Sequence, residues 1–196
     1  MYPRTVIVTA EREVEIWPMT ADDASALLGF YRSLPPEDLL YLREDVTKLE
    51  SMTRWVESIE SEQSWHLLAG YEGRIIADGE LDHQFYGWSR HVGEMRLVVD
   101  PAFRGSGLSM LIAQEVLAQA ADEGLHKVMV QMMVDQHPAI HLFKKLGFRH
   151  EALLTEHVQD QHGHLRDLII MAYFIEDFLE HYNPSESAEG PRDLLR

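Results

Sequence analysis

The fold of this 196-residue chain is decided by the stretch Glu94-Met-Arg-Leu-Val-Val-Asp-Pro-Ala-Phe-Arg-Gly-Ser-Gly-Leu-Ser109. An apolar segment typical of a core strand runs through a short loop with two glycines into residues 108–119, where apolar side chains recur at helical spacing. The loop therefore opens a helix N-terminus, whose unpaired N–H groups can hold a pyrophosphate. The stretch predicts a phosphate cradle with a carboxylate, Glu94, upstream of it.

Length and composition suit one domain. We expect a single domain over residues 1–182, because domains commonly span roughly 100–200 residues. The segment Asn183-Pro-Ser-Glu-Ser-Ala-Glu-Gly-Pro191 lacks core-forming side chains, so residues 183–196 are expected to be a mobile C-terminal tail. The absence of cysteine excludes a disulfide framework, a thiolate zinc site and a cysteine nucleophile, and it is compatible with a reducing cytoplasm.

The charge balance restricts the partners. With 33 acidic and 17 basic residues the formal net charge is −16, which opposes nucleic acid and anionic membranes and favours cationic partners. The longest apolar run, Leu168-Ile-Ile-Met-Ala-Tyr-Phe-Ile175, is far shorter than the roughly 18 residues of a membrane span, and the first ten residues do not resemble a secretory signal. We therefore expect a cytoplasmic protein that binds neither nucleic acid nor membranes.

The pattern along the chain predicts an α/β (α+β) fold. Glu72-Gly73 is a tight-turn signal between two apolar strands, which indicates an antiparallel hairpin. Strands are expected at about 13–17, 64–71, 74–81, 91–99, 126–134 and on both sides of 160–163; helices are expected at about 20–34, 35–42, 47–59, 108–119 and 138–146.

Three segments, in this order and spacing, resemble the GNAT superfamily of N-acetyltransferases: Leu97-Val-Val-Asp-Pro101, Arg104-Gly-Ser-Gly-Leu-Ser109 and Ala139-Ile-His-Leu-Phe-Lys-Lys-Leu-Gly-Phe148. The likeness covers about residues 13–175. It implies a mixed, largely antiparallel, twisted sheet flanked by helices and splayed between its fourth and fifth strands. In that family a bulge in the fourth strand opens the gap, and the pantetheine arm of the co-substrate acetyl-CoA fills it.

The resemblance also implies a set of cofactor-binding residues. The loop amides would hold the coenzyme A pyrophosphate, since glycine allows the backbone to approach closely. An amide near Val99 would polarise the thioester carbonyl as an oxyanion hole does. The implied set is Leu97, Val98, Val99, Arg104, Gly105, Ser106, Gly107, Leu108, Ser109, Gln136 and Phe143. A dinucleotide-binding loop is disfavoured because the third glycine and a downstream acid are missing, and the P-loop Gly-Lys-Ser/Thr is absent.

Glu94 is the candidate general base. It precedes Arg104 by the offset at which bacterial protein lysine acetyltransferases that regulate acyl-CoA synthetases place their catalytic glutamate, so the role is implied by this resemblance. The chemistry needs a base because a lysine ammonium, with a pKa of about 10.4, is not nucleophilic until it loses a proton. The alternative is that Glu94 is an ordinary outward residue, or pairs with Arg96 or Arg90.

Ser109 departs mildly from the family pattern, and two further departures lie in the second half of the chain. Gln136 stands where asparagine is common, and Phe143 stands where many members carry the tyrosine that protonates the departing thiolate. Water, His137 or His141 could protonate the thiolate instead, although both histidines are expected on a helix surface. The histidines at 157, 162 and 164 lack a ligand motif, so no metal site is expected.

The sequence as a whole predicts an enzyme that moves acetyl from acetyl-CoA to a primary amine by direct attack. The expected acceptor is a protein lysine. A small-molecule amine such as a polyamine or aminoglycoside is the alternative acceptor, and a non-catalytic acyl-CoA-binding sensor is the alternative class. A homodimer is left open.

Overall fold

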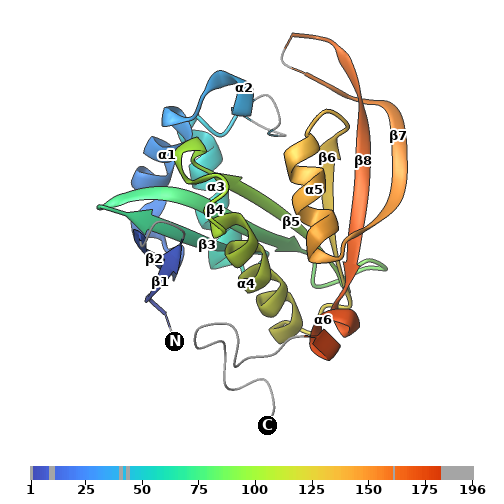
Figure 1. Ribbon diagram of the computed structural model, residues 1–196, viewed down its shortest axis with the longest axis horizontal. Helices are drawn as coiled ribbons and strands as arrows, with labels where there is room; N and C mark the ends of the chain where they lie inside the picture. The colour runs from blue at the N-terminus through green and yellow to red at the C-terminus, as the bar shows by residue number, and fades with distance from the viewer. Residues whose placement is uncertain (1, 9–11, 40–41, 43–44, 161, 182–196) are drawn as a thin grey trace.

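The computed structural model describes the chain except for residues 1, 9–11, 40–41, 43–44, 161 and 182–196 (Figure 1). The C-terminal tail expected at 183–196 lies outside the described residues. Among the residues that are described, no helix is long and apolar enough to cross a membrane.

The centre of the molecule is an eight-stranded sheet in the order β1-β2-β3-β4-β5-β6-β8-β7. Every neighbouring pair is antiparallel except β5 and β6, which run parallel. The expected mixed, largely antiparallel sheet is therefore confirmed. The strands are β1 (Arg4–Val8), β2 (Arg12–Pro18), β3 (Ser64–Tyr71), β4 (Arg74–His83), β5 (Val92–Val99), β6 (Lys127–Met133), β7 (Arg149–Gln159) and β8 (Leu165–Phe174).

Helices cover both faces of the sheet. On one face lie α1 (Ala24–Ser33) and α3 (Leu49–Glu60), packed on β3 and β4. On the other lies α4 (Leu108–Asp122), packed on β3, β4 and β5, with α5 (His137–Leu146) and α6 (Ile175–His181) beside it (Figure 1). The four-residue α2 (Pro36–Leu39) and two 3-10 turns, Ala21–Asp23 and Pro101–Phe103, complete the order.

Two elements were not expected from the sequence. The first is β1, in which buried Val6 and Val8 alternate with exposed Ile7. Glu115 of α4 accepts a 2.7 Å hydrogen bond from the Tyr2 hydroxyl and forms an ion pair with Arg4. Residues 168–175 were expected as strand only, whereas the chain turns into α6 at Ile175. Because β1 precedes the first expected strand, the strands expected as fourth and fifth are β5 and β6.

The expected splay lies between β5 and β6. The two strands pair only from Val92–Glu94 to Lys127–Met129. Past this point β5 stays paired with β4 as far as Val99, and β6 stays paired with β8 as far as Met133, so each strand follows a different neighbour. The register of β4 with β5 is continuous from Gly93 to Val99. The bulge that the family resemblance implied in this strand is thus not found in that pairing.

Candidate active site

The loop between β5 and α4 is shaped by its own side chains. Asp100 accepts a hydrogen bond from the amide of Ala102 at 2.8 Å and so starts the 3-10 turn. Phe103 is buried and packs edge-on against Tyr71, with ring centroids 5.2 Å apart, which anchors the loop to the sheet. Gly105 and Gly107 then take φ values of +74° and +89°, a region that side chains rarely adopt.

The hydrogen bonds within the loop use every second amide. The N–H groups of Arg104 and Ser106 donate to Pro101 and Phe103, and that of Leu108 donates to the Ser106 hydroxyl. Among the described residues, no hydrogen bond within the loop uses the amide of Gly105, Gly107 or Ser109. A Cβ placed on either glycine meets no atom within 4 Å, so there is room beside both glycines. This open cradle at a helix start fits an anionic pyrophosphate.

Arg104 is held by an acid that sequence reasoning missed. Its guanidinium is 54% exposed and forms a 2.7 Å ion pair with Oδ1 of Asp38, on α2. The second oxygen of Asp38 is buried and has no hydrogen-bond partner among the residues that the structure describes. Nothing in the sequence pairs the two residues, because they come from segments far apart in the chain. The cation of the cradle therefore already has an anionic partner.

Glu94 lies on the sheet face that carries α1 and α3. Along β5 the side chains of Glu94 and Arg96 share one face, whereas those of buried Met95 and Val99 pack towards α4. Glu94 is half-buried and stands directly opposite exposed Asp82 on β4. Two neighbouring carboxylates thus lie beside the start of the splay. Two carboxylates attract a cationic amine, because opposite charges attract and each favours the charged form of the other.

A buried polar network lies next to this pair, and sequence reasoning missed it. The Tyr31 hydroxyl donates to Asp78 at 2.8 Å, and Asp78 also contacts Nδ1 of His66 at 3.0 Å. Glu80, 3.8 Å from Nε2 of His66, accepts a 2.5 Å hydrogen bond from Arg96. The detectable signal was the spacing of two acids in an otherwise apolar strand, Asp78 and Glu80, which places both on one face.

The network shifts the pKa values of His66, Tyr31 and Arg96. Burial by itself would lower the pKa of His66, but the carboxylates of Asp78 and Glu80 raise it above its ordinary value. Burial, and then the charge of Asp78, raises the pKa of the Tyr31 hydroxyl well above its ordinary value. Burial opposes the charge of Arg96, yet the carboxylate of Glu80 raises the pKa of Arg96. The carboxylates of the network therefore favour the protonated forms of His66, Tyr31 and Arg96.

The remaining predicted site residues lie along β5 and on α5. Leu97 and Val98 are half-buried and Val99 is buried, on the part of β5 that has left β6. Gln136 precedes α5 and accepts a 2.8 Å hydrogen bond from the amide of Met133, so it closes the turn after β6. Phe143 is buried, with its ring centroid 5.1 Å from that of Phe148. His137 and His141, the substitute acids considered, are exposed on α5, as expected.

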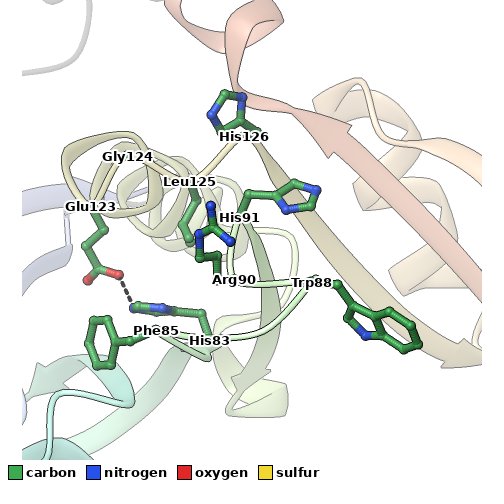
Figure 2. Close-up of a pocket in the computed structure, with 9 residues that line it drawn as sticks. All are labelled: His83, Phe85, Trp88, Arg90, His91, Glu123, Gly124, Leu125 and His126. Carbon is green, nitrogen blue, oxygen red and sulfur yellow. Dashed lines mark ion pairs between the residues drawn. The ribbon is translucent and has the colours of Figure 1, made fainter.

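A separate open hollow of about 620 Å³ lies near the start of β5, at the end of the strand away from the glycine loop (Figure 2). An ion pair of 2.6 Å joins His83 at the end of β4 to Glu123 at the end of α4. The lining contains none of the site residues predicted from the sequence. It is formed by His83, Phe85, Trp88, Arg90, His91, Glu123, Gly124, Leu125 and His126.

Comparisons with known proteins agree with this geometry. Residues 22–148 match the model of the acetyltransferase (GNAT) family. A mycothiol acetyltransferase of Pseudarthrobacter chlorophenolicus is 31% identical over 106 residues, which cover 50% of this chain and 33% of the relative. The chain thus spans about a third of the length of that relative.

Solved structures share the fold. An acetyltransferase of the GNAT family from Streptococcus pneumoniae superimposes with a TM-score of 0.73 at 21% identity, covering 83% of this chain and 99% of the other. The GNAT domain of S. lividans PAT gives 0.73 at 17% identity, covering 88% and 96%. The putative acetyltransferase yncA from Salmonella typhimurium, solved with its cofactor acetyl-CoA, gives 0.71 at 18% identity, covering 83% and 94%.

Proposed function

Because the chain belongs to the GNAT family of acetyltransferases, we propose that it transfers an acetyl group from acetyl-CoA to a primary amine, with a protein lysine as the acceptor. The observation that carries the proposal is the glycine loop at the start of α4. Its two left-handed glycines follow β5, which parts from its parallel neighbour β6 after Glu94.

On the donor side, the amides of Gly105, Gly107 and Ser109 and the guanidinium of Arg104 would bind the pyrophosphate. The β6-facing backbone of Leu97–Val99 would pair with the pantetheine arm, because the β5–β6 ladder ends at Glu94 and Met129. An amide near Val99 would then stabilise the negative charge that develops on the thioester oxygen.

On the acceptor side, Glu94 takes a proton from the ammonium. The freed amine attacks the thioester carbon, and the resulting tetrahedral centre collapses as the C–S bond breaks and the thiolate leaves with its electron pair. The nitrogen, which became positively charged on attack, loses its second proton to solvent to give the neutral amide. The support for a lysine is the offset of Glu94 from Arg104, and the support for any cationic acceptor is the Asp82–Glu94 pair beside the splay. A polyamine fits the same pair of carboxylates and is the second candidate.

The direct experiment is to incubate the protein with acetyl-CoA and separate panels of lysine-containing proteins and small amines, and to measure released CoA together with the mass of the acceptor. Acetylated lysine supports the proposal. Acetylated polyamine with unmodified protein would replace the acceptor, whereas tight acetyl-CoA binding without release of CoA in any panel would indicate a sensor.

Asp38→Asn is expected to tighten acetyl-CoA binding several-fold. The change keeps the shape of the side chain but removes a carboxylate that occupies Arg104 and would repel a pyrophosphate. Titration calorimetry at low and high salt checks this, because the gain should shrink as salt screens the charges. Asp45→Asn, in the same part of the chain but paired with Lys48, is the matched control and should leave the affinity unchanged. Weaker binding in Asp38→Asn would show that Asp38 instead orients Arg104 for the ligand.

Phe143→Tyr is expected to leave acetyl-CoA binding nearly intact and to preserve or raise turnover at low pH, because a tyrosine hydroxyl can protonate the leaving thiolate. Thermal unfolding is measured in parallel, since a hydroxyl buried without a partner at this position would cost about 1–3 kcal/mol. Phe148→Tyr, which alters the other ring of the same contact, is the control. A large loss of turnover in a stable Phe143→Tyr protein would contradict the alignment of Phe143 with the usual acid.

A further inference from the structure

The β4–β5 register places four charged side chains in two facing pairs. Asp82 stands opposite Glu94, and one step along the same face Glu80 stands opposite Arg96. Three of the four are carboxylates. Arg96 is the cation among them and is two residues from Glu94 on the same strand face.

The side chain of Arg96 is enclosed on several sides. From β4, Glu80 accepts its hydrogen bond at 2.5 Å, and from α3, the ring of Trp55 lies 5.9 Å from its guanidinium carbon. Only 27% of the Arg96 side chain and 6% of the Glu80 side chain are exposed. The interactions are therefore screened little by solvent. The carboxylate of Glu80, and to a smaller extent that of Glu94, raises the pKa of Arg96. A nearby cation in turn favours the ionised form of a carboxyl group.

Glu80 also lies near the imidazole of His66. Nε2 of His66 lies 3.8 Å from Glu80, while Nδ1 of His66 contacts Asp78, which also accepts from Tyr31 of α1. Among the described residues, the titratable side chains that interact with Arg96 are Tyr31 of α1, His66 of β3, Glu80 of β4 and Glu94 of β5. Glu80 therefore lies between the imidazole of His66 and the guanidinium of Arg96.

We propose that Arg96 is a positioning residue whose charge keeps Glu94 as a carboxylate ready to accept the amine proton, and that Glu80 sets how much of that charge Glu94 experiences. The inference rests on the proposed role of Glu94 as the general base. It gives the Arg96–Glu80 ion pair a function, although neither residue takes part in the acetyl transfer itself. Glu80 and Arg96 are expected to act on the base in opposite directions.

The test is the pH dependence of kcat, whose acidic limb reports the base in the enzyme–substrate complex. The variants are Arg96→Gln, Arg96→Lys and Glu80→Gln, with acetyl-CoA and the best acceptor found in the panels. Arg96→Gln should move the limb up by about one pH unit, so that kcat below the limb falls about tenfold while kcat above it stays near that of the wild type. Glu80→Gln should move the limb down, and Arg96→Lys should leave it near its wild-type position.

The outcomes separate this inference from the function it rests on. A wild-type limb that persists in Glu94→Gln would overturn both, since the limb would then belong to another group. A limb that depends on Glu94 but stays in place in Glu80→Gln, or moves in the same direction as in Arg96→Gln, would overturn the inference alone. Equal loss of kcat at every pH in Arg96→Gln would show a merely structural role. If thermal unfolding shows that Arg96→Gln does not fold, the nearly isosteric Glu80→Gln decides.

Discussion

Glu94→Gln is expected to lower kcat at neutral pH by about 10²–10⁴-fold while the affinity for acetyl-CoA changes little. Glutamine keeps the shape of the side chain opposite Asp82 but cannot accept a proton from the acceptor ammonium. The donor cradle lies at the other end of the strand and the loop that follows it, so coenzyme binding is not expected to depend on this carboxylate. Steady-state kinetics with a verified acceptor, together with calorimetry for acetyl-CoA, measure the two effects separately.

The pH dependence sharpens this prediction. As the pH rises towards the pKa of the acceptor, free amine becomes abundant without help from the enzyme, so turnover of Glu94→Gln should keep climbing after the wild-type rate has levelled off. Glu15→Gln, at an exposed glutamate on β2, serves as the control and should follow the wild-type curve. If Glu94→Gln matches the wild type across this range, Glu94 is structural and water or another group removes the proton.

Gly107→Asp is expected to abolish measurable acetyl-CoA binding. The new carboxylate would stand at the first position before α4, where the proposed pyrophosphate lies, and apposed like charges in a binding site cost several kcal/mol. Because each 1.4 kcal/mol is about tenfold in affinity, the loss should exceed about a hundredfold. Calorimetry measures the binding, and the far-UV circular dichroism spectrum should remain that of the native protein.

Backbone strain at this position needs its own control. Gly107 has a φ of +89°, so an aspartate there is strained whether or not a ligand binds. Gly87 has the same φ of +89°, and a Cβ there likewise meets no atom within 4 Å, but it lies in the loop between β4 and β5, away from the glycine loop. Gly87→Asp should therefore show the same loss of stability without loss of binding. Unchanged affinity in Gly107→Asp would remove the loop from the donor site.

Much of the fold follows from local patterns. The alternation in 64–71 and 74–81 with a turn at Glu72-Gly73 is realised as β3 and β4, and both turn residues have the positive φ that such a turn requires. The helices after the glycine loop and before Gly147 begin and end within a few residues of their expected bounds. In contrast, β1 was missed because a five-residue strand is stable only beside β2 and under Glu115, which the local sequence does not reveal.

The sequence by itself determined the glycine loop, the carboxylate upstream of it and the family resemblance, because backbone conformation and helix starts depend on neighbouring residues. The tertiary structure alone decided that Asp38 pairs with Arg104 and that Arg96 pairs with Glu80 beside Glu94. These contacts join segments that meet only after the sheet is assembled and α1, α2 and α3 have packed. An ion pair depends on the distance between two side chains in space, and this distance is set by strand register and helix packing.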